Sequence, residues 1–311
     1  MKPIILDCTL RDGGLVNNFY FSDEFVRDLY HMNIETGVDY MEFGYKASEK
    51  VFDSSKFGKW KFTSEKSVRE IVGENKTSLK LAAMVDIGRT EKTDIIPKNE
   101  SVFDMMRIAT YSSDIPAALD MIEYCHNLGY ETTVNIMAVS DNSTNEIKQY
   151  LHELVQSPVD VIYLVDSFGA FFPENITELA ALYGSESSLH KKQLGIHAHN
   201  NQQMAFANTI EAYRCGIAFL DATVNGMGRG AGNCSLEMLF GYLESRNFTY
   251  NKAPVLEFIE KHILPMQEQG FCWGYDIPYL LTGQKKVHPS RAIKFIQDGN
   301  VEYSKMFREM E

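Results

Sequence analysis

Short apolar runs alternate with longer amphipathic segments along most of the chain. The first run, residues 4–8 (IILDC), is apolar and includes β-branched residues, which is typical of a strand. A helical pattern follows from Ser22, a favourable N-cap, to Gly37, a favourable terminator. The alternation predicts strands at 4–8, 39–44, 78–86, 101–110, 131–139, 159–169, 192–199 and 217–226, and helices at 22–37, 63–73, 113–129, 143–157, 173–184 and 202–216, with another helix after Asn233.

This order of elements predicts an α/β fold. Strands that alternate with helices pair in parallel, and eight strand–helix units within about 245 residues favour a (β/α)8, or TIM, barrel. A doubly wound open sheet is the alternative, and it would usually carry a G-x-G-x-x-G motif after the first strand. The sequence RDGG at residues 11–14 does not match that motif. We therefore expect a barrel domain over residues 1–248.

The remaining residues, 249–311, do not continue the alternation. Residues 253–283 and 288–299 have the pattern of short helices interrupted by proline and aromatic residues. Residues 301–311 are charged and could form either a helix or a frayed end. We expect a C-terminal helical extension that packs on the barrel or on a partner.

The composition is that of an ordinary globular protein, with 44% hydrophobic and 23% charged residues. A net charge of −12 and a pI of 5.2 argue against nucleic acid or an anionic membrane as the main partner, because both require basic patches. The first ten residues do not resemble a signal peptide, and no apolar run approaches the roughly 18 residues of a membrane span. Five scattered cysteines without a C-x-x-C pair predict free thiols and a cytoplasmic location.

Polar residues that can carry chemistry gather at the carboxyl ends of the predicted strands. In TIM barrels this end of the strands forms the active site. The residues that the pattern places there are Thr9, Arg11, Asp12, Glu42, Asp86, Arg107, Asn135, Asp166, Ser167, His197, His199, Asn200, Asn225, Arg229 and Asn233.

Two histidines in the motif LGIHAHNNQ give the clearest indication of a metal site. His197 and His199 are two residues apart on a predicted strand, so their side chains share one face. Asp12 would meet them across the barrel mouth, and Asn233 could add an amide oxygen. Such a set suits a divalent cation: Mn²⁺, Mg²⁺, Fe²⁺, Co²⁺ or Zn²⁺. Arg11, beside Asp12, would help to polarise a 2-oxo acid and stabilise an enolate oxygen.

Each of these motifs alone is more often structural. A single H-x-H is usually incidental, and RDGG is more often a turn than a catalytic loop. Glu42, Arg107, Asn135 and Asp166 could simply satisfy polar groups at the barrel mouth. The shared position of all these residues at one end of one predicted barrel is what favours a metal site.

Three motifs resemble a known superfamily. DCTLRDGG near the N-terminus, GIHAHNN on the seventh predicted strand and NGMGRGAGN after the eighth are similar to the HMG-CoA lyase-like, or pyruvate carboxyltransferase-like, TIM-barrel metallolyases. The resemblance spans roughly residues 3–245. Known members include 4-hydroxy-2-oxovalerate aldolase, HMG-CoA lyase, isopropylmalate synthase and homocitrate synthase. MRIATYSSDI and VDSFGAFFP are most similar to the aldolase branch.

The resemblance implies a ligand set and a substrate site. It makes Mn²⁺ or Mg²⁺ the expected metal, with Zn²⁺ or Co²⁺ as alternatives. It assigns Arg11 to the substrate carbonyl and enolate. The metal ligands that it implies are Asp12, His197, His199 and, in some members, Asn233, and it places Ser167 at the pyruvate carboxylate. Glu42 and Arg107, which the strand ends supply, are further expected substrate-binding residues.

The sequence departs from both branches of the superfamily at the acid–base position. The aldolases carry a histidine two residues after the glycine of RDG, where this chain has Leu15. The acyl-CoA synthases usually continue with Glu-Gln, where this chain has Gly14 and Leu15. The general base is therefore unassigned, with Tyr45, Tyr111 and Glu42 as possible replacements.

The leading hypothesis is a metal-dependent aldolase that cleaves or forms a 4-hydroxy-2-oxo acid through a pyruvate enolate. The alternatives are a Claisen-type synthase that joins an acyl-CoA to a 2-oxo acid, and a catalytically silent relative. Metal-dependent hydrolysis fits less well, because amidohydrolase barrels carry H-x-H on the first strand. The expected partners are a 2-oxo acid and an aldehyde, a second copy of the chain in a homo-oligomer, and a dehydrogenase.

Overall fold

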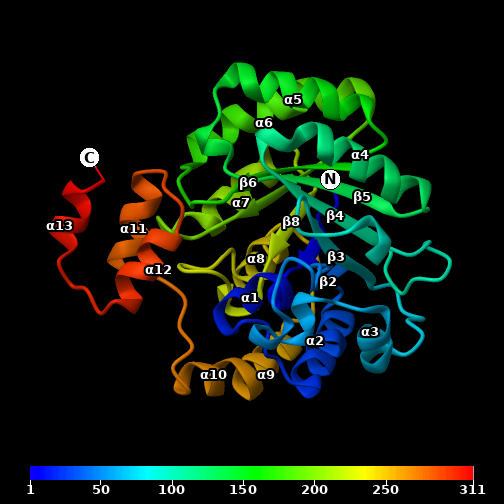
Figure 1. The fold of residues 1–311 in the computed structure, drawn as a ribbon, viewed down its shortest axis with the longest axis horizontal. Coiled ribbons are helices and arrows are strands. Elements are labelled where there is room, and N and C mark those ends of the chain that lie inside the picture. The colour runs from blue at the N-terminus through cyan, green and yellow to red at the C-terminus, as the bar shows by residue number, and fades with distance from the viewer. Residues whose placement is uncertain (311) are drawn as a thin grey trace.

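Eight parallel strands form a closed barrel in chain order, as the sequence predicts (Figure 1). The computed structural model describes residues 1–310. The last strand pairs with the first, with Leu6 opposite Asp221, and this pairing closes the barrel. The strands are β1 (Ile4–Asp7), β2 (Tyr40–Tyr45), β3 (Lys80–Asp86), β4 (Met105–Thr110), β5 (Glu131–Ile136), β6 (Val161–Asp166), β7 (Gln193–Ala198) and β8 (Phe219–Ala222).

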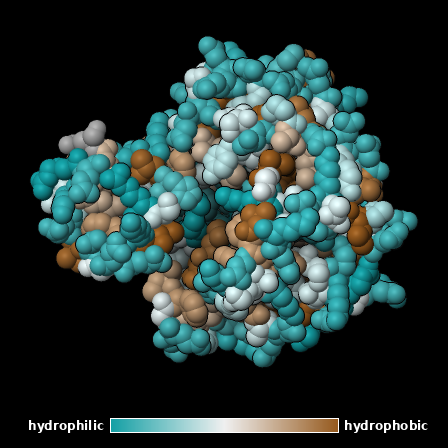
Figure 2. Space-filling view, in the orientation of Figure 1, coloured by the Kyte–Doolittle hydropathy of each residue, from teal (hydrophilic) through white to brown (hydrophobic). Residues whose placement is uncertain are grey.

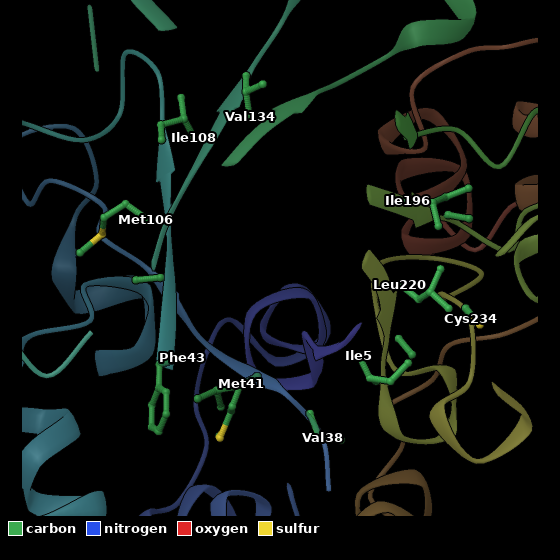
Figure 3. Close-up of a cluster of buried hydrophobic side chains, with 14 of the residues drawn as sticks. Ile5, Val38, Met41, Phe43, Met106, Ile108, Val134, Ile196, Leu220 and Cys234 are labelled. Carbon is green, nitrogen blue, oxygen red and sulfur yellow. The ribbon is translucent and has the colours of Figure 1, made fainter. Parts of the chain in front are cut away.

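Alternation along each strand separates two buried layers. Outward side chains such as Ile5, Met106 and Ile196 pack beneath the surrounding helices and form the main apolar core (Figure 3). Inward side chains such as Tyr163 and Phe219 fill the lower part of the barrel. The inward positions nearer the carboxyl ends are therefore the ones that can build a site at the mouth.

Helices cover the outside of the barrel and are capped much as their sequences predict. The Ser22 hydroxyl accepts a hydrogen bond from the Phe25 amide at 3.1 Å, and Gly37 ends the same helix with a φ of 82°. The helices around the barrel are α1 (Thr9–Asn17), α2 (Asp23–Thr36), α3 (Glu65–Val72), α4 (Ile115–Asn127), α5 (Thr144–Gln156), α6 (Pro173–Ser187), α7 (Ala205–Arg214) and α8 (Leu236–Glu244).

One connection differs from the sequence-based expectation. The RDGG segment is not a turn but lies within α1, although two adjacent glycines disfavour a helix. Packing explains this, because a β-carbon at Gly13 would lie 2.8 Å from the sulfur of Met227 and one at Gly14 would collide with the ring of Phe19. Between β3 and β4, the described residues 87–104 contain no α-helix and only a short 3₁₀ turn, Lys92–Asp94.

The C-terminal extension is helical, as expected, and has two parts. The helix α9 (Ala253–Phe258), a π-helical turn (Ile259–Ile263) and α10 (Leu264–Glu268) lie against α2, where the rings of Phe25 and Phe258 are 5.0 Å apart. The helices α11 (Ile277–Gln284), α12 (Ser290–Gln297) and α13 (Tyr303–Arg308) form a lobe at the left of Figure 1, on the side of β6 and α7.

The lobe is joined to the barrel mouth by polar contacts. The Asn201 amide donates a hydrogen bond to the Tyr279 carbonyl oxygen at 3.2 Å. Residues 301–310 include α13, and residue 311, the end of the predicted terminal segment, lies outside the described part of the chain. Hydrophilic residues cover most of the face shown in Figure 2. Within residues 1–310, no helix has the length and apolarity that crossing a membrane requires.

Candidate functional site

A cavity of about 250 Å³ lies at the carboxyl ends of the strands. This is the end where a TIM barrel carries its chemistry. The cavity is lined by eight of the residues that the sequence placed at the strand ends: Arg11, Asp12, Asp86, Asn135, Ser167, His197, His199 and Arg229.

The four predicted metal ligands lie together at this mouth. Asp12 comes from α1, and its Oδ2 lies 3.6 Å from His197 Nε2 and 3.9 Å from His199 Nε2. The two imidazole rings are 5.1 Å apart and nearly perpendicular. Asn233 reaches the same point because it forms an isolated bridge with His199, and its amide contacts the Asp12 carboxylate. Three chain segments distant in sequence therefore converge on one point.

The donor atoms of this cluster fit a divalent cation. His197 Nε2 and Asn233 Oδ1 are buried and have no hydrogen-bond partner within the described chain, and Asp12 Oδ1 has only the ion pair with Arg11. A buried polar atom without a partner costs on the order of 1–3 kcal/mol. Two imidazoles with a carboxylate and an amide oxygen form a mixed nitrogen and oxygen set that suits first-row divalent metals and Mg²⁺. A cation at this point would satisfy all three atoms.

The glycine-rich segment after β8 makes the approach possible. A β-carbon at Gly228 would lie 3.0 Å from Asp12 Oδ2 and would collide with the side-chain amide of Asn233. Only glycine leaves both ligands where they are.

Asp221 orients His197. Its Oδ2 lies 2.9 Å from His197 Nδ1, so the imidazole that donates from Nδ1 presents a free Nε2 toward Asp12. Asp221 was not predicted as a site residue, since it lies in the middle of the predicted eighth strand, 217–226, and no motif marks it. Its inward parity with Phe219 is the signal that could have identified it.

Asp221 belongs to a buried chain of alternating charges. Arg107 contacts Asp221 at 2.6 Å through Nη2 and Glu42 at 2.8 Å through Nη1. The same Glu42 oxygen accepts from Arg11 Nε at 2.9 Å, and Arg11 Nη1 lies 3.1 Å from Asp12 Oδ1. Since Asp12 and Asp221 both contact His197, the charges close into a ring across the barrel.

Glu42 and Arg107 therefore have a different place from the one expected. Both were predicted to bind substrate, but both are fully buried within the ring and neither lines the cavity. The reason is their position in the strands. Both side chains point into the barrel one layer below the mouth, and there they form ion pairs with neighbouring side chains. Glu42 contacts Arg11, and Arg107 contacts Asp221, which in turn contacts His197.

The electrostatics of the cluster suit metal binding. Burial alone would raise the pKa of Asp12, but Arg11, followed by the two histidines, holds it well below its usual range. Burial, aided by Arg229, lowers the pKa of His199 well below 6.5. Burial opposes protonation of His197, yet the nearby carboxylates of Asp12 and Asp221 raise its pKa. Asp12 is thus ionised and His199 neutral, the states that metal ligands require.

A second triad does not make a separate metal site. Cys8 Sγ lies 3.9 Å from His197 Nδ1, beside Asp221. Burial raises the pKa of the Cys8 thiol well above its usual value, so it is not a thiolate. The imidazole nitrogen that it would share is already bound to Asp221.

Of the other predicted residues, Ser167 and Asn135 line the cavity and Asp166 does not. Ser167 lines the cavity, with its hydroxyl accepting from the Ala138 amide at 2.9 Å. Asn135 also lines it and accepts from the Thr133 hydroxyl. The Asp166 carboxylate accepts hydrogen bonds from the backbone amides of Ala170 and Phe171, in the loop before α6, and burial raises its pKa to about 6.

Of the possible acid–base residues, Tyr45 and Tyr111 line the cavity, as does Leu15. A register shift between Glu42 and Tyr45 interrupts the pairing of β2 with β3 and turns Tyr45 toward the mouth. Burial, opposed by Arg11, raises the pKa of Tyr45 to about 12, so it stays protonated at neutral pH. Leu15, at the position of the aldolase histidine, supplies no titratable group.

Three titratable residues of the cavity were not predicted from the sequence: Lys61, Arg89 and His288. Lys61 comes from the loop between β2 and α3, and His288 from the C-terminal lobe. Neither follows a strand directly, so a rule based on strand ends could not find them. Burial, with the charges of Arg229 and Arg89, lowers the pKa of His288 to about 4.

The family profile of the HMGL-like proteins matches residues 2–255. The chain belongs to the HMGL-like family. This confirms the resemblance drawn from the three motifs. The family includes lyases and aldolases, and the chain is accordingly an enzyme that acts on carbon–carbon bonds.

Curated HMGL-like relatives carry two different names. An oxaloacetate decarboxylase of Mycobacterium tuberculosis is 28% identical over 250 residues, which cover 79% of this chain and 71% of the relative. A 4-hydroxy-2-oxovalerate aldolase of Thermus thermophilus is 28% identical over 242 residues, 78% of this chain and 69% of the relative. Among solved structures, the N-terminal domain of a candidate aldolase from Bacteroides vulgatus superposes with a TM-score of 0.82 and 26% identity, over 98% of this chain and 99% of that domain.

Proposed function

We propose that this protein is a divalent-metal-dependent aldolase that cleaves or forms a 4-hydroxy-2-oxo acid through the enolate of pyruvate. The observation that carries the proposal is the buried cluster of Asp12, His197 and His199 with Arg11 beside it, all facing one cavity. The 28% identity to a 4-hydroxy-2-oxovalerate aldolase supports the same chemistry.

Asp12, His197 and His199 would hold the metal, with Asn233 as a further oxygen ligand. Mn²⁺ or Mg²⁺ is the proposed ion, because two of the donors are oxygens and the cavity leaves room for a substrate. When bound, such an ion supplies Lewis-acid polarisation of the 2-oxo group.

Arg11 is proposed to stabilise the enolate oxygen. Its guanidinium is fixed by Glu42 on one side and Asp12 on the other, so it is already oriented before the substrate binds. A preorganised donor of this kind contributes on the order of 10²–10³-fold in rate. Ser167 and Arg229 are proposed to bind the carboxylate of the 2-oxo acid. They are adjacent, since Arg229 Nη2 donates to the Ser167 carbonyl oxygen at 3.1 Å.

Leu15 favours a second candidate, decarboxylation of a 2-oxo diacid. Aldol cleavage requires a base to remove the proton of the 4-hydroxyl group, and Leu15 cannot act as one. Loss of CO₂ from oxaloacetate breaks the bond between C3 and C4, leaves the same pyruvate enolate and needs no such base. The Mycobacterium tuberculosis relative is named for this reaction.

Deuterium exchange tests the chemistry that both candidates share. Pyruvate is incubated with the protein in D₂O, with Mn²⁺ or Mg²⁺ or with EDTA, and its methyl protons are followed by NMR. We expect metal-dependent exchange that Asp12→Asn abolishes and Arg11→Met slows about 10²–10³-fold. Full exchange by Arg11→Met would refute the role of Arg11, and no exchange with any metal would favour a catalytically silent relative.

Turnover then separates the candidates. Pyruvate released from 4-hydroxy-2-oxovalerate supports the aldolase, whereas CO₂ released from oxaloacetate, at a rate above that of the metal alone, supports the decarboxylase. Condensation of acetyl-CoA with a 2-oxo acid would instead indicate a Claisen-type synthase.

A further inference from the structure

Lys61 is a buried cation without a counter-ion. Its side chain is only 6% exposed, and no carboxylate oxygen among residues 1–310 lies within 4.0 Å of its ammonium group. Aromatic rings surround it instead: those of Tyr45 and Phe52 at 4.3 Å, Phe19 at 5.2 Å and Phe57 at 5.8 Å. Cation–π contacts compensate only part of the cost of removing an ammonium from water.

This ammonium belongs to the same cavity as the proposed metal cluster. The cavity is lined by the cations Arg11, Lys61, Arg89 and Arg229, but by only two carboxylates, Asp12 and Asp86. Those two carboxylates are already paired, with Arg11 at 3.1 Å and with Arg89 at 2.8 Å. Any metal in the cluster would add to the positive excess.

Two cations in the cavity therefore have no carboxylate partner within the described chain, and they differ in position. Arg229 lies beside Ser167 and His199, and it contacts the neutral His288 at 3.2 Å. Lys61 lies on the other side, with Tyr45 and near Asp86. A 2-oxo acid with one carboxylate can satisfy only one of them.

We propose that the substrate is a 2-oxo acid with a second anionic group, a carboxylate or a phosphate, and that Lys61 binds this group. This inference rests on the proposed function, because it assigns the first carboxylate to Arg229 and Ser167. The second anion then lies beyond the bond that breaks and stays with the aldehyde product. A methionine would fill the aromatic cage at lower cost, so the ammonium group is explained by the ligand that it meets.

Within the aromatic cage formed by Phe19, Tyr45, Phe52 and Phe57, the Lys61 ammonium is charged and available to a substrate anion. Burial lowers its pKa to about 8, with Asp86 opposing the shift, so most molecules carry the charge at pH 7. The faces of the aromatic rings contain no oxygen or nitrogen acceptor, so they leave the three N–H groups of Lys61 free to bind a substrate anion. Arg89, the neighbouring cation, is held by Asp86 and adds to the positive field.

Binding of two 2-oxo acids of equal length tests the proposal without turnover. The full chain with Mn²⁺ is titrated by calorimetry with 2-oxoglutarate, which has a distal carboxylate, and with 2-oxovalerate, which has none. We expect 2-oxoglutarate to bind about 10- to 100-fold more tightly, in line with one charge-assisted hydrogen bond. Lys61→Met should remove this preference and leave 2-oxovalerate unchanged, whereas Lys61→Arg should keep most of it.

Lys59→Met is the matched control. Lys59 is two residues away and pairs with Asp23 at 2.5 Å, but it does not line the cavity. Equal affinity of the wild type for both acids would overturn the proposal. An equal loss of both affinities in Lys61→Met, in a variant with an unchanged circular dichroism spectrum, would overturn it as well.

Condensation of pyruvate with paired aldehydes identifies the anion. A preference for succinic semialdehyde over butanal indicates a carboxylate, and one for glyceraldehyde 3-phosphate over glyceraldehyde indicates a phosphate. The pyruvate exchange assay keeps the two proposals separate. Exchange without an anion preference in binding overturns only the role of Lys61, whereas tighter 2-oxoglutarate binding without exchange overturns the aldolase and supports the anion site.

Discussion

Asp221→Asn should weaken metal binding although Asp221 is not one of the proposed metal ligands. Its carboxylate accepts from His197 Nδ1 at 2.9 Å and so holds the tautomer that presents Nε2 to the metal. An amide in its place lowers the basicity of the imidazole and lets the ring turn. Loss of such an outer partner reduces metal affinity about 10- to 100-fold, or about 1.4–2.7 kcal/mol.

The same substitution should also destabilise the fold. Arg107 is fully buried and loses one of its two carboxylate partners, keeping only Glu42. Leaving a buried charge incompletely compensated costs about 3–5 kcal/mol. We expect about 3 kcal/mol for Asp221→Asn, since the amide oxygen still accepts a hydrogen bond. Urea denaturation in EDTA measures this effect apart from metal binding.

Competition with a chromophoric chelator measures the metal affinity, at a temperature where both proteins are folded. Tyr163→Phe is the control, because it removes only a buried hydroxyl, from a ring 4.6 Å from the Arg107 guanidinium, and leaves both carboxylate partners of Arg107 in place. It should keep wild-type metal affinity. If Asp221→Asn lost stability but bound metal as tightly as the wild type, Asp221 would serve Arg107 alone and the orienting role would be refuted.

Three further predictions follow from the cavity. Gly228→Ala should lower metal affinity at least about tenfold, because the added β-carbon would displace Asp12 and Asn233. Gly241→Ala is the control, since the space around Gly241 is open and metal affinity should not change. Equal metal affinities of the two variants would contradict this prediction. Mn²⁺ at 100 times its Kd should add about 2.7 kcal/mol to the free energy of unfolding, read as a thermal shift that Asp12→Asn lacks. Burial lowers the pKa of Lys61 from 10.5 in the unfolded chain to about 8 in the folded one. The charged Lys61 therefore lowers the free energy of unfolding fully below pH 8, and this destabilisation disappears as the pH rises to 10.5. Lys61→Met should therefore raise the free energy of unfolding by about 1–3 kcal/mol at pH 7, allowing for lost cation–π contacts, and hardly at all near pH 10.5; a gain independent of pH would disprove the assignment.

Much of the fold was predictable because its signals are local. Each strand is a short apolar run whose period sets which residues face inward, and eight such runs in series leave few alternatives to a barrel. The same logic located Asp12, His197, His199 and Asn233, since the ends of parallel strands meet at one rim. Their convergence required no knowledge of side-chain contacts.

The features that the sequence did not reveal depend on contacts between distant segments. RDGG lies in a helix because Met227 and Phe19 pack against its glycines, and no local propensity encodes that. Asp221 is a strand residue whose importance comes from Arg107 and His197. Lys61 reaches the cavity from a long loop, and nothing within that loop indicates which wall it will face.

The ring of charges inside the barrel is best understood as a positioning device. Buried ion pairs contribute little net stability compared with apolar residues of the same volume, so stability alone does not explain their presence. Two members of this ring belong to the proposed active site: Arg11 at the proposed enolate oxygen and His197 at the proposed metal. Glu42, Arg107 and Asp221 join them through contacts of 2.6–2.9 Å, which fixes the guanidinium and the imidazole relative to each other across the barrel. An apolar layer could fill the same space, but it could not set the distance between the group that stabilises charge and the group that binds the metal.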